Sequence, residues 1–320
     1  MLKKILMTEA MHNVGMKVLE EKFEIIIAPD KSHKTLSKMI VDVDALVVKL
    51  TKIESSLLDK GNHLKLLVKH ASGFNDIEIK KASANNILVL NAGDANANSV
   101  AEHTLIAMGC MFKRVLFMDR ATRNCEWGAK FDNKSLDLDG ATLGLIGLGN
   151  IGLLLAKKAQ QAFNMKIIAY DPYINPEMAS NSGVTLVNDI DEICISADAI
   201  SIHTPLTDET RNLIDARRLA LLKPTAVLVN FARGGIVEET ALYKALKNRQ
   251  ILGAALDVFK DEPVKKDNPL FELDNVVLSP HAAAYTENCR MRISLAVANG
   301  IIDYFEGRRP KFVVNPEILK

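Results

Sequence analysis

Three residues in the second half of the chain carry side chains suited to proton and carboxylate chemistry: Arg233, Glu262 and His281. An arginine can hold a carboxylate through its planar fork and polarise a neighbouring carbonyl. A histidine can give a proton to a carbonyl oxygen and take it back, and a glutamate beside it would orient the ring and favour its charged form. Such a set suits hydride transfer between a nicotinamide and a 2-keto acid. Each residue taken alone could also have a purely structural role. Arg233 could form an ion pair, Glu262 could end a turn, and His281 could simply have its hydrogen bonds filled within the fold.

A glycine-rich segment offers a place for phosphates. Gly147, Gly149 and Gly152 form a G-x-G-x-x-G pattern that follows an apolar run and opens a helical one. Strand, tight turn and helix in this order are typical of a dinucleotide site, with the pyrophosphate at the helix N-terminus. Asp171 lies nineteen residues further on, after a second strand-like segment. Its carboxylate would accept hydrogen bonds from a ribose 2′-hydroxyl and repel a 2′-phosphate, which favours NAD over NADP. An S-adenosylmethionine site or a plain structural turn is the alternative.

The elements that must position these residues alternate between short apolar strands and helices. Strand candidates in the second half are 143–146, 166–170, 199–203, 226–230, 253–258 and 276–278. Ligands of doubly wound sheets bind at the carboxyl ends of the strands, where the glycines, Asp171 and the three chemical residues all fall. We therefore predict a doubly wound parallel sheet that binds the dinucleotide, over residues 99–286.

The first hundred residues show the same alternation on a smaller scale. We predict an α/β fold of two Rossmann-like domains, with the NAD domain inserted in a smaller, flavodoxin-like substrate domain made of 1–98 and 287–320. A helix predicted from Ser99 to about Arg123, with Asn98 or Ser99 as N-cap, connects the two. The backbone of the loop containing Ser72 could hold a carboxylate, and an ordinary strand-to-helix turn is the alternative.

Composition argues against several classes of protein. The net charge is +1 with Lys and Arg scattered, and aromatic residues make up 5%, so we expect no nucleic acid or membrane partner. No apolar stretch is long enough to span a bilayer, and the first nine residues suggest a strand more than an export signal. Four widely spaced cysteines without a C-x-x-C pattern argue against disulfides and zinc. We expect no metal and a cytoplasmic location.

Six motifs in order resemble the D-isomer-specific 2-hydroxyacid dehydrogenases, a family that includes phosphoglycerate dehydrogenase and hydroxypyruvate/glyoxylate reductase. The motifs are 99–104, 140–144 leading into 147–152, 203–207, 230–235, 257–259 with 262–263, and 279–281. The similarity covers nearly the whole chain. It implies an NAD-dependent oxidoreductase that transfers a hydride between the nicotinamide and C2 of a small D-2-hydroxy or 2-keto acid.

The resemblance also implies roles for individual residues and a homodimer formed through the cofactor domains. Arg233, Glu262 and His281 would be catalytic, and Lys49, Ser72 and Gly73 would face the substrate. Asp257 and the backbone near Phe231 and Ala232 would hold the carboxamide of the nicotinamide. Other implied cofactor contacts are Thr104, Asn150, Ile151, His203, Thr204, Pro205, Thr210 and Ala283.

Departures from the family pattern leave the substrate open. Asn150 and Lys49 stand where many relatives carry arginine, and Cys125 replaces a glycine before Trp127. The substrate is therefore expected to be small, whether phosphorylated or not. An NAD-sensing interaction module of the C-terminal binding protein type keeps the same three catalytic residues, and formate or phosphite dehydrogenases are further alternatives. The chain shows no extended tail, from which we expect the enzyme.

Overall fold

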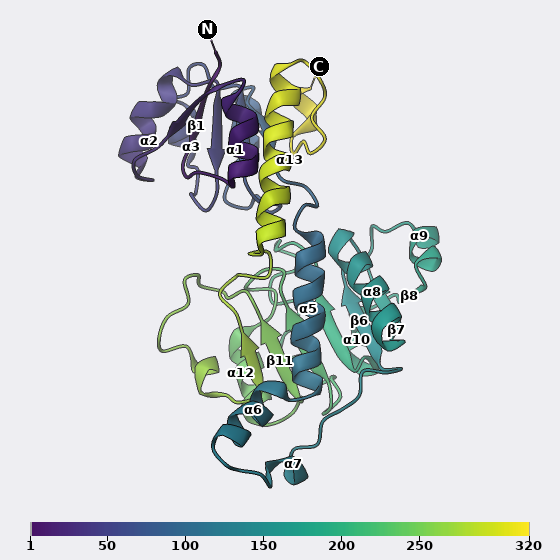
Figure 1. The fold of residues 1–320 in the computed structure, drawn as a ribbon. Helices are drawn as coiled ribbons and strands as arrows, with labels where there is room; N and C mark the ends of the chain where they lie inside the picture. The colour runs from purple at the N-terminus through teal and green to yellow at the C-terminus, as the bar shows by residue number, and fades with distance from the viewer. Residues whose placement is uncertain (1, 320) are drawn as a thin grey trace. The chain divides into compact units, whose positions relative to one another are not determined.

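The computed structural model describes residues 2–319, and the chain divides into two compact units (Figure 1). Unit 1 comprises Met1–Asn96 and Tyr285–Lys320, and unit 2 comprises Ala97–Ala284. The chain thus leaves unit 1, forms all of unit 2 and then returns. That unit 1 binds the substrate stays a prediction.

Unit 2 is built on a seven-stranded parallel sheet in the order β12-β11-β10-β9-β6-β7-β8. Six strands follow the 3-2-1-4-5-6 order of the doubly wound dinucleotide fold, and a seventh extends it. The predicted fold class is confirmed, although the sequence reading missed β8. The strands are β6 (Thr142–Ile146), β7 (Lys166–Tyr170), β8 (Val184–Leu186), β9 (Ala199–Ile202), β10 (Val227–Asn230), β11 (Gly253–Leu256) and β12 (Val276–Leu278).

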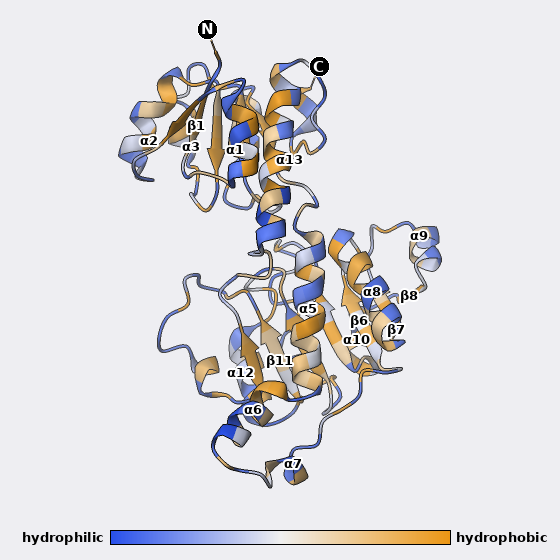
Figure 2. Cartoon of the chain, viewed as in Figure 1, coloured by the Kyte–Doolittle hydropathy of each residue, from blue (hydrophilic) through white to orange (hydrophobic). Residues whose placement is uncertain are grey.

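Alternate residues of these strands face two different hydrophobic cores, as the period of two in a strand requires. In β6, Leu143 and Leu145 join one core and Ile146 joins the other. Both faces of the sheet are therefore covered by helices, which explains why its strands are continuous apolar runs; they stand out as orange arrows in Figure 2. The first core includes α5 (Ala97–Phe112) and α8 (Asn150–Phe163), and the second includes α10 (Ile190–Ser196), α11 (Ala216–Leu219) and α12 (Glu239–Lys247).

The long helix predicted from Ser99 to about Arg123 is in fact two helices. The first is α5, and the second is α6 (Val115–Arg123). Between them Arg114 adopts a φ of 50°, a left-handed conformation that breaks the helix. The predicted N-cap is also wrong, because Asn98 and Ser99 lie inside α5, where the Asn98 amide donates to Glu102 Oε1 at 2.8 Å. Two short helices complete unit 2: α7 (Ala129–Asp132) and α9 (Pro176–Asn181), with a 3-10 turn at Pro269–Glu272.

Unit 1 contains a five-stranded parallel sheet in the order β2-β1-β3-β4-β5, which is the flavodoxin-like order predicted from the sequence. Its C-terminal helix α13 (Glu287–Phe305) packs along α1 and against β4, so the returning chain completes this unit. The strands are β1 (Lys4–Met7), β2 (Glu24–Ile27), β3 (Ala45–Val48), β4 (Leu66–Lys69) and β5 (Leu88–Leu90). The helices are α1 (Asn13–Glu20), α2 (His33–Met39), α3 (Ser55–Leu58) and α4 (Ile79–Ala84), with 3-10 turns at Ile40–Asp42 and Pro316–Ile318.

No helix within residues 2–319 combines the length and the apolar character needed to cross a bilayer.

Candidate active site

The glycine-rich turn between β6 and α8 forms a cradle at the helix N-terminus. Gly147 has a φ of 95°, and a Cβ there would lie 2.8 Å from the carbonyl oxygen of His203, so the turn requires glycine. At Gly149 a Cβ would meet no described atom within 4 Å. Gly149 is the N-cap of α8, and within residues 2–319 no side chain caps this helix, so its first N–H groups are open to a ligand. Space and donors both fit the pyrophosphate of a dinucleotide.

Asp171 follows β7 and is tied directly to this cradle. Its Oδ2 accepts a hydrogen bond from the N–H of Leu148 at 2.7 Å, and its Oδ1 accepts one from the N–H of Tyr173 at 2.9 Å. Each carboxylate oxygen can accept a second hydrogen bond, so both remain able to receive ribose hydroxyls. Asp171 therefore shapes the glycine turn and presents a negative charge beside it.

The segment after β9 adds a histidine and a threonine. His203 Nε2 lies 2.9 Å from Ser201 Oγ, and burial lowers the pKa of His203 to about 4, so its ring is neutral near pH 7. Thr204 Oγ1 is buried without a hydrogen-bond partner within residues 2–319, which suits a site that a ligand completes. The Thr210 hydroxyl donates to the carbonyl of Pro205 at 2.7 Å and so fixes this loop.

Three further residues named from the sequence lie on helices of unit 2. Asn150 is exposed as the first residue of α8, and Ile151 follows it half-buried. Thr104 is fully buried in α5, with its hydroxyl donated to the carbonyl of Val100 at 2.8 Å. Thr104 thus has no exposed atom to offer a cofactor in this arrangement, and its implied contact stays a prediction.

Glu262 and His281 come together although nineteen positions separate them. Oε2 of Glu262 lies 2.7 Å from Nδ1 of His281, and its Oε1 accepts the N–H of Phe259 at 3.0 Å. Both oxygens of the carboxylate are therefore engaged, which fixes the orientation of the imidazole and leaves Nε2 as the ring nitrogen facing away from Glu262. The two side chains are 38% and 52% exposed, so a substrate can reach them.

Asp257 orders the loop that carries His281. Its buried carboxylate accepts hydrogen bonds from Ser279 Oγ at 2.6 Å, from the N–H of Ala282 at 2.7 Å and from the N–H of Ala283 at 2.9 Å. The N–H of His281 also donates to the carbonyl of Asp257 at 2.8 Å. The segment after β12 is thus fastened to the end of β11, and this holds His281 in its left-handed backbone conformation, with a φ of 52°.

Arg233 lies in the loop after β10, which is pressed against the loop after β11. A Cβ on Gly234 would lie 1.8 Å from the carbonyl oxygen of Phe259, so only glycine permits this approach. The buried amide of Asn230 accepts the N–H of Ala232 at 3.1 Å and donates to the carbonyl of Arg233 at 2.9 Å. The sequence alone does not indicate this role of Asn230 or Gly234. A polar residue at the end of the buried strand β10 is the signal that could have identified Asn230.

The residues expected to face the substrate belong to unit 1. Lys49 Nζ donates to the carbonyl of Ala10 at 2.5 Å, and burial, together with the charge of Arg290, lowers its pKa. No pattern in the sequence points to His70, whose pKa is lowered to about 4 by burial and by the charge of Lys49. The Ser72 hydroxyl donates to Asn96 Oδ1 at 2.8 Å, and Gly73 follows it in the same loop. Arg233, Glu262 and His281 therefore lie in unit 2, whereas Lys49, Ser72 and Gly73 belong to unit 1.

Comparison with known proteins decides the family. The model of the D-isomer specific 2-hydroxyacid dehydrogenase NAD-binding domain matches residues 105–283, more than half of the chain. The chain belongs to the D-isomer specific 2-hydroxyacid dehydrogenase family. The resemblance seen in the sequence is thereby confirmed, and so is NAD as the cofactor of unit 2.

Relatives of this family match along both units. D-3-phosphoglycerate dehydrogenase of Methanocaldococcus jannaschii is 42% identical over 313 residues, 98% of this chain, but the chain spans only 59% of that protein's length. Glyoxylate reductase of Korarchaeum cryptofilum is 34% identical over 324 residues, 99% of this chain and 97% of that protein. The crystal structure of D-lactate dehydrogenase from Aquifex aeolicus, complexed with NAD and lactic acid, has a TM-score of 0.85 with 28% identity over 95% of this chain and 96% of that one.

Proposed function

We propose that the chain reduces a small 2-keto acid to a D-2-hydroxy acid with NADH, and catalyses the reverse oxidation, through Arg233, Glu262 and His281. The observation that carries this proposal is the 2.7 Å pair between Glu262 and His281, formed at strand ends of an NAD-binding sheet next to the Arg233 loop. When bound, the nicotinamide supplies or accepts the hydride.

His281 has the geometry of a general acid and base. Glu262 holds Nδ1, so Nε2 can give a proton to the carbonyl oxygen during reduction and take it back during oxidation. The same contact keeps the imidazole oriented for this transfer. His203 does not compete for this role, because its pKa of about 4 leaves it uncharged at neutral pH.

Arg233 would bind the carboxylate of the substrate through its planar fork and polarise the carbonyl beside it. The loop is held in place for that task by two contacts. The Asn230 amide donates to the backbone carbonyl of Arg233, and Gly234 lies close to the carbonyl oxygen of Phe259. On the side of unit 1, the N–H groups of the loop containing Ser72 and Gly73 are a second candidate for carboxylate binding, and Lys49 is a candidate for a distal anionic group.

The test is a panel of glyoxylate, hydroxypyruvate and 3-phosphohydroxypyruvate assayed for NADH oxidation, in wild type and in Lys49→Gln. We expect turnover of at least one 2-keto acid. If Lys49 binds a distal phosphate, the variant should lose kcat/KM for the phosphorylated acid by roughly tenfold and keep it for glyoxylate, as expected for one lost charge-assisted hydrogen bond. Tight NADH binding without turnover of any acid would favour an NAD-sensing interaction module instead.

We also propose a homodimer and a cytoplasmic location. The homodimer is supported by large apolar side chains exposed on unit 2, among them Ile106 on α5, Trp127, and Phe131 on α7, at 66%, 74% and 71%. The cytoplasmic location is supported by the four free cysteines. Sedimentation of the purified protein should give twice the monomer mass, and Ile106→Asp should reduce it if α5 lies in the interface.

A further inference from the structure

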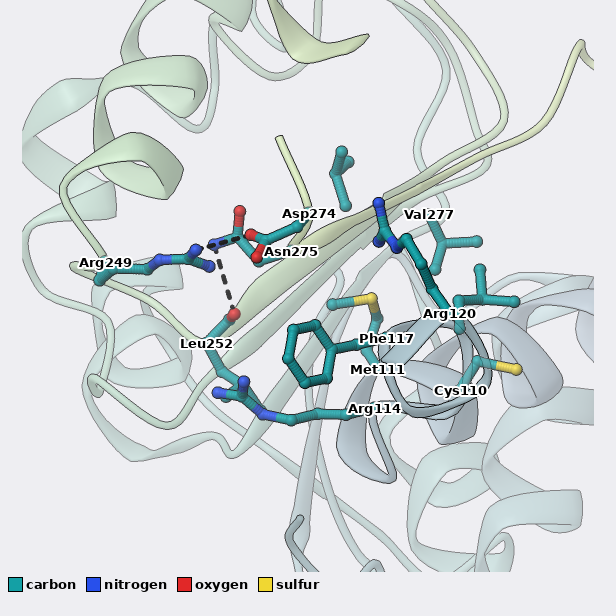
Figure 3. A pocket seen from close by; sticks show the side chains of 12 residues that line it. Cys110, Met111, Arg114, Phe117, Arg120, Arg249, Leu252, Asp274, Asn275 and Val277 are labelled. Atoms are coloured by element: carbon teal, nitrogen blue, oxygen red, sulfur yellow. Dashed lines mark hydrogen bonds and ion pairs between the residues drawn. The ribbon is translucent and has the colours of Figure 1, made fainter. Parts of the chain in front are cut away.

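A small cavity lies at the amino-terminal ends of β11 and β12, at the opposite ends of these strands from Asp257 and His281. Unit 2 alone forms it, from the end of α5, from α6 and from the segments that precede the two strands (Figure 3). Its volume is about 70 Å³. A single water needs only about 10–15 Å³. The cavity therefore has room for a small polyatomic ion and not for a nucleotide.

The lining of this cavity is strongly positive. Three arginines reach it, Arg114, Arg120 and Arg249, against one carboxylate, Asp274. Arg249 Nη2 lies 2.6 Å from Asp274 Oδ1, as Figure 3 shows, and Arg114 Nη1 donates to Asn133 Oδ1 at 2.9 Å. The Arg120 side chain has no ion pair or hydrogen bond within residues 2–319. Two positive charges are thus left without a matching anion.

Two buried polar atoms of the lining also lack partners within residues 2–319. Asn275 is only 6% exposed, and its Nδ2 donates to the carbonyls of Leu246 and Leu252 at 3.2 and 3.5 Å. These bonds fix the amide and leave Oδ1 as an acceptor without a donor. Nε of Arg114 is a buried donor without an acceptor. Both atoms lie beneath the cavity surface, so the guanidinium groups of the lining are what a ligand in the cavity would meet.

We propose that this cavity is an anion site that binds hydrogen phosphate. The charged oxygens match the guanidinium groups of Arg114, Arg120 and Arg249, which bind oxyanions through planar forks. The site lies at the amino ends of β11 and β12, so a bound anion stabilises the two strands whose other ends carry Asp257 and His281.

The test is calorimetric titration with inorganic phosphate at constant ionic strength, with saturating NADH so that the cofactor site is filled. Arg120→Gln removes an exposed side chain of the lining, and we expect roughly tenfold weaker phosphate binding from the loss of a charge-assisted bond. Arg123→Gln is the matched control, because Arg123 lies on the same helix but pairs with Asp119. That control should bind phosphate like wild type.

Arg233→Gln separates this site from the active site, and it should keep phosphate binding. The proposal is overturned if binding is lost in Arg233→Gln but unchanged in Arg120→Gln, or if wild type takes up no phosphate below about 10 mM, where screening by added salt is still modest.

Discussion

Replacing Asp171 by asparagine should narrow the preference for NAD over NADP. The carboxylate of Asp171 is held by the N–H groups of Leu148 and Tyr173, at the position where the 2′-phosphate of NADP would lie. Asparagine keeps the shape and one acceptor oxygen but removes the charge. The change therefore tests electrostatic repulsion with the smallest disturbance of the glycine turn.

The size of the effect follows from the charges. A unit charge about 5 Å from a phosphate carrying about −1.5, at an effective dielectric constant of about 40 for a half-buried group, is repelled by about 2.5 kcal/mol. That is a factor of about 70 in the Kd of NADPH. NADH should bind about fivefold more weakly, because a neutral acceptor forms a weaker bond to the ribose than a charged one by about 1 kcal/mol.

Fluorescence titration of NADH and NADPH gives both dissociation constants without a known substrate. The matched control is Asp198→Asn, because the carboxylate of Asp198 also accepts a backbone N–H, that of Thr142 at 2.8 Å, but at the amino end of β6. The Asp198→Asn variant should lose a similar amount of folding stability. It should leave the ratio of the NADPH and NADH dissociation constants unchanged. A constant ratio in Asp171→Asn, or an equal change in Asp198→Asn, would refute the role given to Asp171.

Three more variants test the rest of unit 2. Arg233→Lys keeps a charge and loses the fork, so kcat/KM for the keto acid should fall at least about a hundredfold while the Kd of NADH stays within about twofold; collapse of both would show a structural residue. Glu262→Gln removes the charge 2.7 Å from His281 and should lower kcat by roughly ten- to a hundredfold with the melting temperature nearly unchanged; a wild-type kcat would contradict the pairing. The pKa of His203 is about 4 in the folded protein, below the value of about 6.5 in an unfolded chain, so the unfolded state binds more protons between these values. Stability should therefore fall as pH drops from about 6.5 to about 4, by on the order of 2 kcal/mol from this residue. Urea unfolding over this pH range should show a smaller loss of stability in His203→Gln than in wild type, by that amount. An equal loss in the two proteins would count against burial as the cause of the lowered pKa.

The secondary structure could be predicted where burial left a clear pattern. The strands of unit 2 that lie inside the sheet are continuous apolar runs, and these were found to within a residue or two. The strand β8 was missed because it has three residues at the edge of the sheet and only Val184 is buried. The break at Arg114 was missed because apolar residues continue at helical spacing on both sides, and an arginine gives no local signal for a left-handed conformation.

The candidate site could be predicted where a residue's type and its place at a strand end suffice. Glu262 and His281 meet this condition, because they follow the neighbouring strands β11 and β12 and lie 2.7 Å apart. That these two residues and Arg233 are catalytic stays a prediction. The roles of Asn230 and Gly234 could not be predicted, because they arise from the approach of two loops that are distant in sequence. The hydrogen bonds and close contacts that hold such loops together depend on the folded backbone, and they leave no periodic pattern in the sequence.

The hydrogen bonds of Asp257 have a consequence for the time course of catalysis. Its carboxylate and carbonyl fix Ala282, Ala283 and His281 through hydrogen bonds that the chain makes with its own atoms. The conformational entropy of that loop is thus lost once, when the protein folds, and not again in each turnover. Mixing the protein with both ligands in a stopped-flow instrument should then show no lag that reflects ordering of this loop. Asp257→Ala should introduce such a lag, whose rate would not depend on ligand concentration.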